Sequence, residues 1–116
     1  MGKQRRKAAP SPYKAMWVLA MFDLPVDTTT ARRWYAQFRK TLIRQGFSML
    51  QFSVYARFFG SDERAEVIRE RVRKSLPPGG EVRLLSVTDH QFAKMEVFLG
   101  KKRGKTEEPP EQLLLF

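Results

Sequence analysis

An unbroken apolar run from Met16 to Phe22 limits the folds open to this chain more than any other feature. The run is too short for a typical helix, and its side chains are apolar at odd and even positions alike. That pattern is typical of a central strand covered on both faces. Asp23 follows directly, ahead of Leu24 and Pro25. A carboxylate at the exit of a buried strand is costly unless something binds it, so Asp23 is the leading candidate for chemistry, with a turn-capping role as the alternative.

The remaining patterns predict an alternation of strands and helices. In chain order the expected elements are a strand at 16–22, a helix from Asp27 to Gly46, two short strands or one bent strand at 47–59, a helix at 62–76, a strand at 81–87, a turn at 88–91 and a last strand at 95–99. This order predicts an α+β, ferredoxin-like βαββαβ fold, with both helices on one face of an antiparallel sheet and an extra C-terminal strand. The expected inward positions of the helices are Ala31, Trp34, Tyr35, Phe38, Leu42, Ala65, Ile68, Val72 and Leu76.

Two helices would cover only one face of such a sheet. Because the first strand is apolar on both faces, something must cover the second face, and a two-fold partner that stacks its own sheet there is the simplest cover. We therefore expect a homodimer. Around the domain at 15–100, residues 1–14 are expected to form a disordered basic arm, and residues 101–116 a basic, proline-containing linker that ends in an apolar peptide.

The chain has 22 Lys and Arg against 12 Asp and Glu, which gives a net charge of +10 at pH 7. Such an excess points to a polyanionic partner, with nucleic acid the first candidate and an anionic membrane surface the second. Where acids are interspersed, as in the second helix, a solvated surface is the simpler explanation. The candidate nucleic-acid contacts lie in acid-poor clusters and are Arg5, Arg6, Lys7, Lys14, Arg32, Arg33, Arg39, Lys40, Lys101, Lys102 and Arg103.

Cysteine is absent, and His90 is the single histidine. Disulfides and thiolate metal sites are therefore excluded. Any metal would be held mainly by carboxylates, carbonyls and water, which favours a hard ion such as Mg²⁺. No apolar run approaches the roughly 20 residues of a membrane span, and the basic N-terminus lacks the cleavage site of a signal peptide. The expectation is a cytoplasmic protein.

Residues 51–55, with the sequence QFSVY, match a signature of glutamine, any residue, serine, valine and an aromatic residue. Together with the apolar strand that ends in Asp23, this signature resembles the Cas2 family of small CRISPR-associated adaptation proteins, over roughly residues 16–100. The resemblance implies a ferredoxin-like homodimer that partners the spacer integrase. It also implies that Asp23 faces its symmetry mate across the dimer axis, where the two carboxylates hold Mg²⁺ or Mn²⁺ for phosphodiester hydrolysis.

The resemblance leads us to expect a CRISPR adaptation subunit that dimerises, binds spacer duplex DNA and bridges integrase subunits. Asp23 would be its catalytic and metal-binding residue in a Mg²⁺-dependent endonuclease acting on single-stranded RNA or double-stranded DNA. No general base is evident beside Asp23, because a lone histidine such as His90, at the end of another strand, is more often structural. Two alternatives stay open: a free-standing, toxin-like ribonuclease of the same fold, and a non-enzymatic adaptor that docks through its C-terminal peptide.

An apolar peptide ends the chain at residues 111–116. Such a peptide after a solvated tail points to docking, as an added strand on its own domain or dimer mate or on another protein such as the integrase. The segment also resembles the peptide by which bacterial replication and repair proteins hold the sliding clamp. The expected partner-binding residues are Gln112, Leu113, Leu115 and Phe116.

Overall fold

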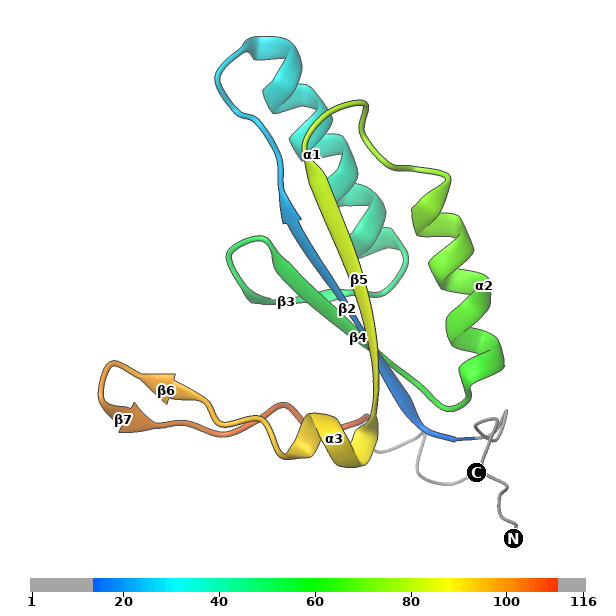
Figure 1. Ribbon diagram of the computed structural model, residues 1–116, viewed down its shortest axis with the longest axis vertical. Coiled ribbons are helices and arrows are strands. Elements are labelled where there is room, and N and C mark those ends of the chain that lie inside the picture. Colours follow the sequence, from blue (N-terminus) through cyan, green and yellow to red (C-terminus); the bar gives the residue numbers. More distant parts are fainter. Residues whose placement is uncertain (1–13, 111–116) are drawn as a thin grey trace, which may run out of the picture.

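A four-stranded antiparallel sheet forms the centre of the molecule in a computed structural model that describes residues 14–110 (Figure 1). Its strands are β2 (Met16–Asp23), β3 (Ser48–Gln51), β4 (Val54–Phe59) and β5 (Glu81–Thr88), in the order β3-β4-β2-β5. The helices α1 (Thr29–Arg44) and α2 (Asp62–Arg73) both pack on one face. This arrangement confirms the predicted α+β, ferredoxin-like fold. No helix among the described residues has both the length and the apolar character needed to cross a membrane.

Both long helices start at a hydroxyl side chain. The Thr28 side chain accepts a hydrogen bond from the backbone nitrogen of Ala31 at 3.0 Å, and the Ser61 side chain accepts one from that of Arg64 at 3.2 Å. Such caps satisfy amide groups that have no partner inside the helix, so α1 begins just after Thr28 and not at Asp27. Buried side chains of both helices pack against β2, and the members of this core include Val18, Ala20, Phe22, Phe38, Leu42, Ala65, Ile68 and Val72.

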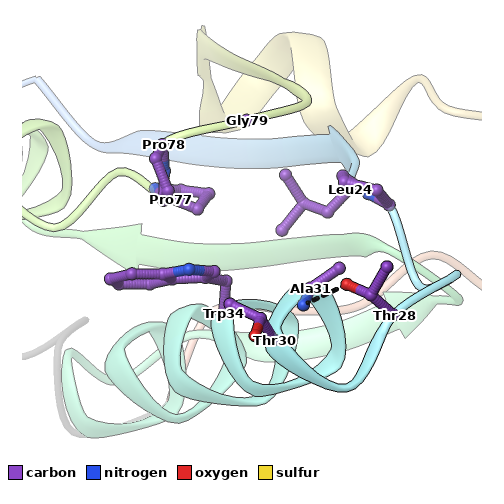
Figure 2. Close-up of a pocket in the computed structure, with 9 residues that line it drawn as sticks. Leu24, Thr28, Thr30, Ala31, Trp34, Pro77, Pro78 and Gly79 are labelled. Atoms are coloured by element: carbon purple, nitrogen blue, oxygen red, sulfur yellow. Dashed lines mark hydrogen bonds between the residues drawn. The ribbon is translucent and has the colours of Figure 1, made fainter.

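Two of the predicted inward positions are wrong. Trp34 is 42% exposed and Leu76 is 48% exposed. Trp34 lines an apolar pocket near the start of α1 and keeps part of its ring in solvent (Figure 2). Leu76 lies beyond α2, which ends at Arg73. Because a residue that precedes a proline disfavours helical geometry, the helix does not continue through Leu76 to Pro77.

The boundary between β3 and β4 lies just after Gln51, within the segment expected to form two short strands or one bent strand. The strand register shifts between Met49 and Gln51, and Ser53 has a φ of 63°. Ser53 also ties this turn to the rest of the fold: its carbonyl accepts a 3.0 Å hydrogen bond from the Phe22 backbone, and its hydroxyl lies 3.3 Å from the Tyr35 hydroxyl. The segment therefore forms two strands, which was one of the two predicted alternatives.

A third helix, α3 (Asp89–Ala93), covers one end of the sheet face opposite α1 and α2. Phe92 stacks on Trp17 with ring centroids 4.0 Å apart, and the Trp17 indole nitrogen donates a 2.8 Å hydrogen bond to the Asp89 carboxylate. The chain itself therefore covers part of the sheet face that the sequence led us to assign to a dimer partner.

The turn predicted at 88–91 is wrong. The Thr88 hydroxyl accepts a hydrogen bond from the Gln91 backbone at 3.0 Å, and the Gln91 side chain accepts one from the Thr88 backbone at 2.9 Å. This reciprocal pair is a capping box, which starts α3.

The strand predicted at 95–99 is shorter than expected and does not join the main sheet. It consists of β6 (Phe98–Leu99), which pairs with β7 (Lys102–Arg103) in a separate two-stranded sheet. This hairpin projects from the α3 end of the molecule (Figure 1). The hydroxyl of Thr106 then donates a 2.8 Å hydrogen bond to the carbonyl of Met95, so the expected linker begins as folded structure.

Candidate functional site

Asp23 is exposed at the end of β2, on the sheet face away from α1 and α2. Alternation along the strand places it on the same face as Trp17 and Leu19, which pack in the second hydrophobic cluster. Its direct cross-strand partner is Glu81 in β5. Directly opposed residues of an antiparallel pair point to the same face with Cβ atoms about 4.5–5.5 Å apart. Two carboxylates therefore meet at this end of the sheet.

An arginine accompanies the two acids. Arg83 lies opposite Met21 and two residues along β5 from Glu81, so it shares their face. Its guanidinium is 3.2 Å from the Glu81 carboxylate, and both side chains are exposed. Asp23 has no ion-pair partner among residues 14–110. We call Asp23, Glu81 and Arg83 the acidic end of the sheet.

Gly80 allows β5 to start close to the end of β2. It has a φ of +84°, and a Cβ atom there would lie 2.7 Å from the Asp23 carbonyl oxygen and 2.7 Å from a methyl carbon of Leu24. Both the backbone angle and the close approach require glycine. Gly80 therefore allows the chain just before β5 to pass close to the end of β2, which carries Asp23.

The acidic end offers part of a metal site. Carboxylate oxygens such as those of Asp23 and Glu81 suit a hard cation. The described part of the chain has no group of three or more His, Cys, Asp and Glu side chains that could hold a metal ion. One chain thus supplies two carboxylates, and other ligands would come from water, a substrate phosphate or a second copy. His90 lies in α3, beyond the other end of β5, and about 23 Å of strand separates that end from Glu81.

Tyr55, the last residue of the signature, and Arg57, two residues farther along β4, both lie away from the acidic end. Tyr55 is 2% exposed and belongs to the core between the sheet and the two long helices. Arg57 pairs with Val18, about 16 Å along β2 from Asp23. Neither residue is therefore a ligand for a phosphate bound at the acidic end.

The predicted nucleic-acid contacts of α1 lie along its exposed surface. Arg32 and Arg33 belong to the start of the helix, after the loop that follows Asp23. Arg32 donates a 3.0 Å hydrogen bond to the carbonyl of Val26 and so packs over that loop. Arg39 and Lys40 are exposed farther along the helix. Of the basic residues in α1, Arg32 and Arg33 are separated from Asp23 by the fewest residues in the sequence.

The other basic residues predicted to contact nucleic acid do not lie beside those of α1. Lys101, Lys102 and Arg103 lie on the hairpin at the α3 end of the molecule (Figure 1), and Lys14 is exposed before β2. The structure therefore separates the basic clusters instead of joining them. The predicted residues that lie outside the described part of the chain are Arg5, Arg6, Lys7, Gln112, Leu113, Leu115 and Phe116.

A pocket of about 320 Å³ lies between the loop after β2, the start of α1 and the segment 77–79 (Figure 2). Leu24 and Trp34 line it from opposite sides, together with prolines, threonines, an alanine and a glycine, and no charged side chain contributes. A phosphodiester is held best by charged side chains, which this pocket lacks. The acidic end remains the better candidate site.

Comparison with known proteins identifies the family of this chain. Residues 16–95 match the family model described as CRISPR associated protein Cas2. Relatives that are each called CRISPR-associated endoribonuclease Cas2 occur in Parvibaculum lavamentivorans, Flavobacterium psychrophilum and Paracidovorax avenae. The first is 54% identical over 101 residues, which cover 87% of this chain and 100% of the relative. The second is 48% identical over 104 residues, covering 90% of each chain, and the third 39% over 104 residues, covering 90% of this chain and 96% of the relative. The family match spans both strands that carry the acidic end of the sheet, and the chain therefore belongs to the CRISPR-associated protein Cas2 family.

Proposed function

We propose that this chain is a metal-dependent endonuclease subunit of CRISPR adaptation that works as a homodimer, with Asp23 as its catalytic residue. The observation that carries the proposal is the exposure of Asp23 beside Glu81, on the sheet face free of α1 and α2. The name endoribonuclease, given to the relatives, supports RNA as a substrate. Duplex DNA is the second substrate that the proposal includes.

Asp23 and Glu81 are the residues that would hold Mg²⁺ or Mn²⁺. A cation held by these two carboxylates would supply the charge that polarises a phosphodiester and activates water for attack on it. The role of Asp23 is to present an exposed carboxylate without a competing ion pair among the described residues. The role of Arg83 is to orient Glu81 through their 3.2 Å ion pair and to offer a positive charge to a phosphate oxygen.

The dimer is supported by the part of the sheet face that α3 leaves open. Leu85, directly opposite Leu19, is 46% exposed, and Met21 is half-buried. Covering such apolar surface contributes roughly 25 cal/mol per Å². A two-fold partner on this face would also bring a second Asp23 to the site and complete the set of ligands.

The adaptation role rests on charge. A net charge of +10, with Arg32 and Arg33 exposed on α1, favours binding of a nucleic-acid backbone, and duplex DNA is the form that the adaptation role requires. In this role the dimer holds the spacer duplex and bridges integrase subunits. Residues 111–116 would then dock on the integrase, with the sliding clamp as the other candidate partner. Deletion of these residues is expected to weaken that assembly while duplex binding is retained.

Asp23→Asn tests the catalytic proposal. Cleavage of labelled single-stranded RNA and of duplex DNA is measured with Mg²⁺, with Mn²⁺ and with a chelator. We expect Asp23→Asn to abolish cleavage and to leave duplex binding intact, because only the metal ligand is lost. The matched control is Asp27→Asn, which removes an exposed carboxylate from the following loop. Full activity in Asp23→Asn, or activity that survives the chelator, contradicts the proposal.

A non-catalytic scaffold is the second candidate function. The observation in its favour is that the single histidine, His90, lies beyond the far end of β5, so no imidazole of this chain can serve as a base beside Asp23. In a cell that expresses the integrase, a scaffold retains full spacer acquisition with Asp23→Asn. Loss of acquisition together with loss of cleavage favours the endonuclease.

A further inference from the structure

A groove of about 750 Å³ lies beside the C-terminal end of α1, away from Asp23. The groove forms at the edge of β4 that faces β3. On this edge β3 pairs with β4 only as far as Ala56, so Arg57 to Phe59 have no strand partner there among the described residues. The turn after α1 and the helix α2 flank the opening. Four arginines line this arginine groove: Arg44, Arg57, Arg64 and Arg71.

The four arginines lack carboxylate partners in the part of the chain that the structure describes. None of them forms an ion pair within 4.0 Å among the described residues. Arg64 and Arg71 are seven residues apart and so share one side of α2. The acids of α2 that form ion pairs, Asp62, Glu66 and Glu70, bind Arg69 and Arg73 instead. The arginine groove therefore concentrates positive charge that no ion pair among residues 14–110 neutralises.

Local contacts hold the guanidinium of Arg57 in place. It donates a 2.6 Å hydrogen bond to the carbonyl of Gln45 and lies 4.6 Å from the centre of the Phe59 ring. Arg71 reaches the side chain of the same Gln45 at 3.4 Å. Partial burial, followed by the charges of Arg64 and Arg71, lowers the pKa of Arg57. A bound anion would relieve this repulsion.

An acidic part of the chain lies along the same groove. Glu107, Glu108 and Pro110 line it from the segment after the hairpin. Neither glutamate forms an ion pair within 4.0 Å among residues 14–110, so the acids approach the arginines without neutralising them. The charge of the groove is thus complementary to that of an anionic chain. The protein's own acidic segment, with Glu107 and Glu108, covers part of it.

We propose that the arginine groove is a second nucleic-acid site that binds the phosphodiester backbone of a strand, and that Glu107 and Glu108 compete with that strand. Guanidinium groups hold phosphate oxygens through charge-assisted, often bidentate hydrogen bonds. The aromatic residues that line the groove, Trp17 and Phe58, are buried, so bases are not expected to stack there. The inference rests on the proposed nucleic-acid binding and adds a site away from Asp23.

The first test removes two exposed arginines, Arg64→Gln with Arg71→Gln, from the full-length chain. Affinity for a labelled DNA duplex and for a labelled single-stranded RNA is measured by fluorescence anisotropy over a range of salt. We expect affinity to fall roughly tenfold and the slope of log affinity against log salt to decrease by about two, because two phosphate contacts are lost. The control, Lys74→Gln with Lys94→Gln, removes the same charge outside the groove and is expected to change affinity by less than about twofold.

The second test removes the competing acids with Glu107→Gln and Glu108→Gln. This pair is expected to tighten nucleic-acid binding in the wild-type background and to have little effect when Arg64 and Arg71 are already replaced. Equal tightening in both backgrounds means that the glutamates act only through overall charge, and the competition is then rejected.

Three results would overturn or redirect the proposal in distinguishable ways. If the Arg64 and Arg71 pair changes affinity no more than the lysine control, while Arg32→Gln with Arg33→Gln weakens binding, the arginine groove is not a nucleic-acid site and the proposed function stands. If the wild-type chain binds neither probe, the proposed function itself fails. A third result is that a labelled glutamate-rich peptide binds the wild-type chain but not the Arg64 and Arg71 variant, while both nucleic-acid probes bind the two proteins equally. The occupant of the groove is then an acidic protein segment, and the nucleic-acid assignment is wrong.

Discussion

The two carboxylates at the acidic end have different surroundings, and this difference assigns their roles. Glu81 is held by Arg83 at 3.2 Å, whereas Asp23 has no such partner among the described residues. An exposed carboxylate free of an ion pair keeps its oxygens available for a cation or for water. Asp23 is therefore the better candidate for direct chemistry, and Glu81 for a second metal ligand whose orientation Arg83 fixes. Gly80 lets the chain just before β5 pass close to the end of β2.

Gly80→Ala is expected to destabilise the protein and to disturb the acidic end. The positive φ alone costs about 1–2 kcal/mol for a residue with a Cβ atom, and the contact with the Asp23 carbonyl adds to this cost. Gly79→Ala is the matched control, because a Cβ there meets nothing within 4 Å. The free energy of unfolding is measured in urea for both variants. Equal stability of the two variants would show that the approach at Gly80 is not tight.

At the scale of elements, α2 shows how an ion-pair network makes stability depend on pH. Hydrogen bonds donated by Arg73 and then by Arg69 lower the pKa of Glu66, and the bonds that Arg73 donates to the carboxylates of Glu66 and Glu70 raise the pKa of Arg73. A carboxyl whose folded pKa is lowered stabilises the folded state above its unfolded pKa. That contribution is lost as the pH falls through the folded value.

Glu66→Gln is therefore expected to reduce the loss of stability on acidification and to lower stability slightly at neutral pH. The control is Glu63→Gln, because Glu63 is exposed and forms no ion pair among residues 14–110. The midpoint of thermal unfolding is followed from pH 7 to below the usual pKa of glutamate. If Glu66→Gln and wild type lose stability in parallel, the network does not contribute.

The elements also show what the sequence can predict. The strand at 16–22 has a continuous apolar run and both long helices have helical periodicity, and these local patterns give their type and order. The Thr88 to Gln91 spacing is likewise a local signal for α3. Glu81 and the arginine groove have no such signal. Glu81 meets Asp23 through a strand register, and the groove joins residues from the turn after α1, β4 and α2. Tertiary packing determines both, so periodicity does not reveal them.

Phe92→Ala is expected to detach α3 from the sheet. Phe92 is 2% exposed and stacks on Trp17, so its truncation is expected to cost about 3–5 kcal/mol. The control is Phe98→Ala on the hairpin, where Phe98 is 56% exposed. Tryptophan fluorescence and denaturant unfolding measure the effect. A loss no larger than that of the control would mean that α3 is not an integral part of the core.

At the scale of the whole molecule, the sheet face opposite α1 and α2 is divided into two parts. Trp17 and Phe58, at the α3 end, are buried by Phe92 and the segment around it. Toward the acidic end, Leu85 is left largely uncovered. A partner that stacks on this face therefore has to meet the part that carries Leu85 and Asp23. The dimer proposal and the metal proposal thus concern the same surface, and disruption of one is expected to affect the other.

Leu85→Glu is expected to convert a dimer into a monomer. In wild type, sedimentation at micromolar concentration is expected to give about twice the chain mass of 13.6 kDa. A charge at the 46% exposed Leu85 would be buried without a partner in stacked sheets, which costs several kcal/mol per ion. Val67→Glu is the matched control, since Val67 is 52% exposed on α2, away from this face. Cleavage is expected to fall with the dimer, because the second Asp23 is lost. A wild-type monomer, or a Leu85→Glu variant that dimerises and cleaves like the control, would remove the reason to place the metal between two chains.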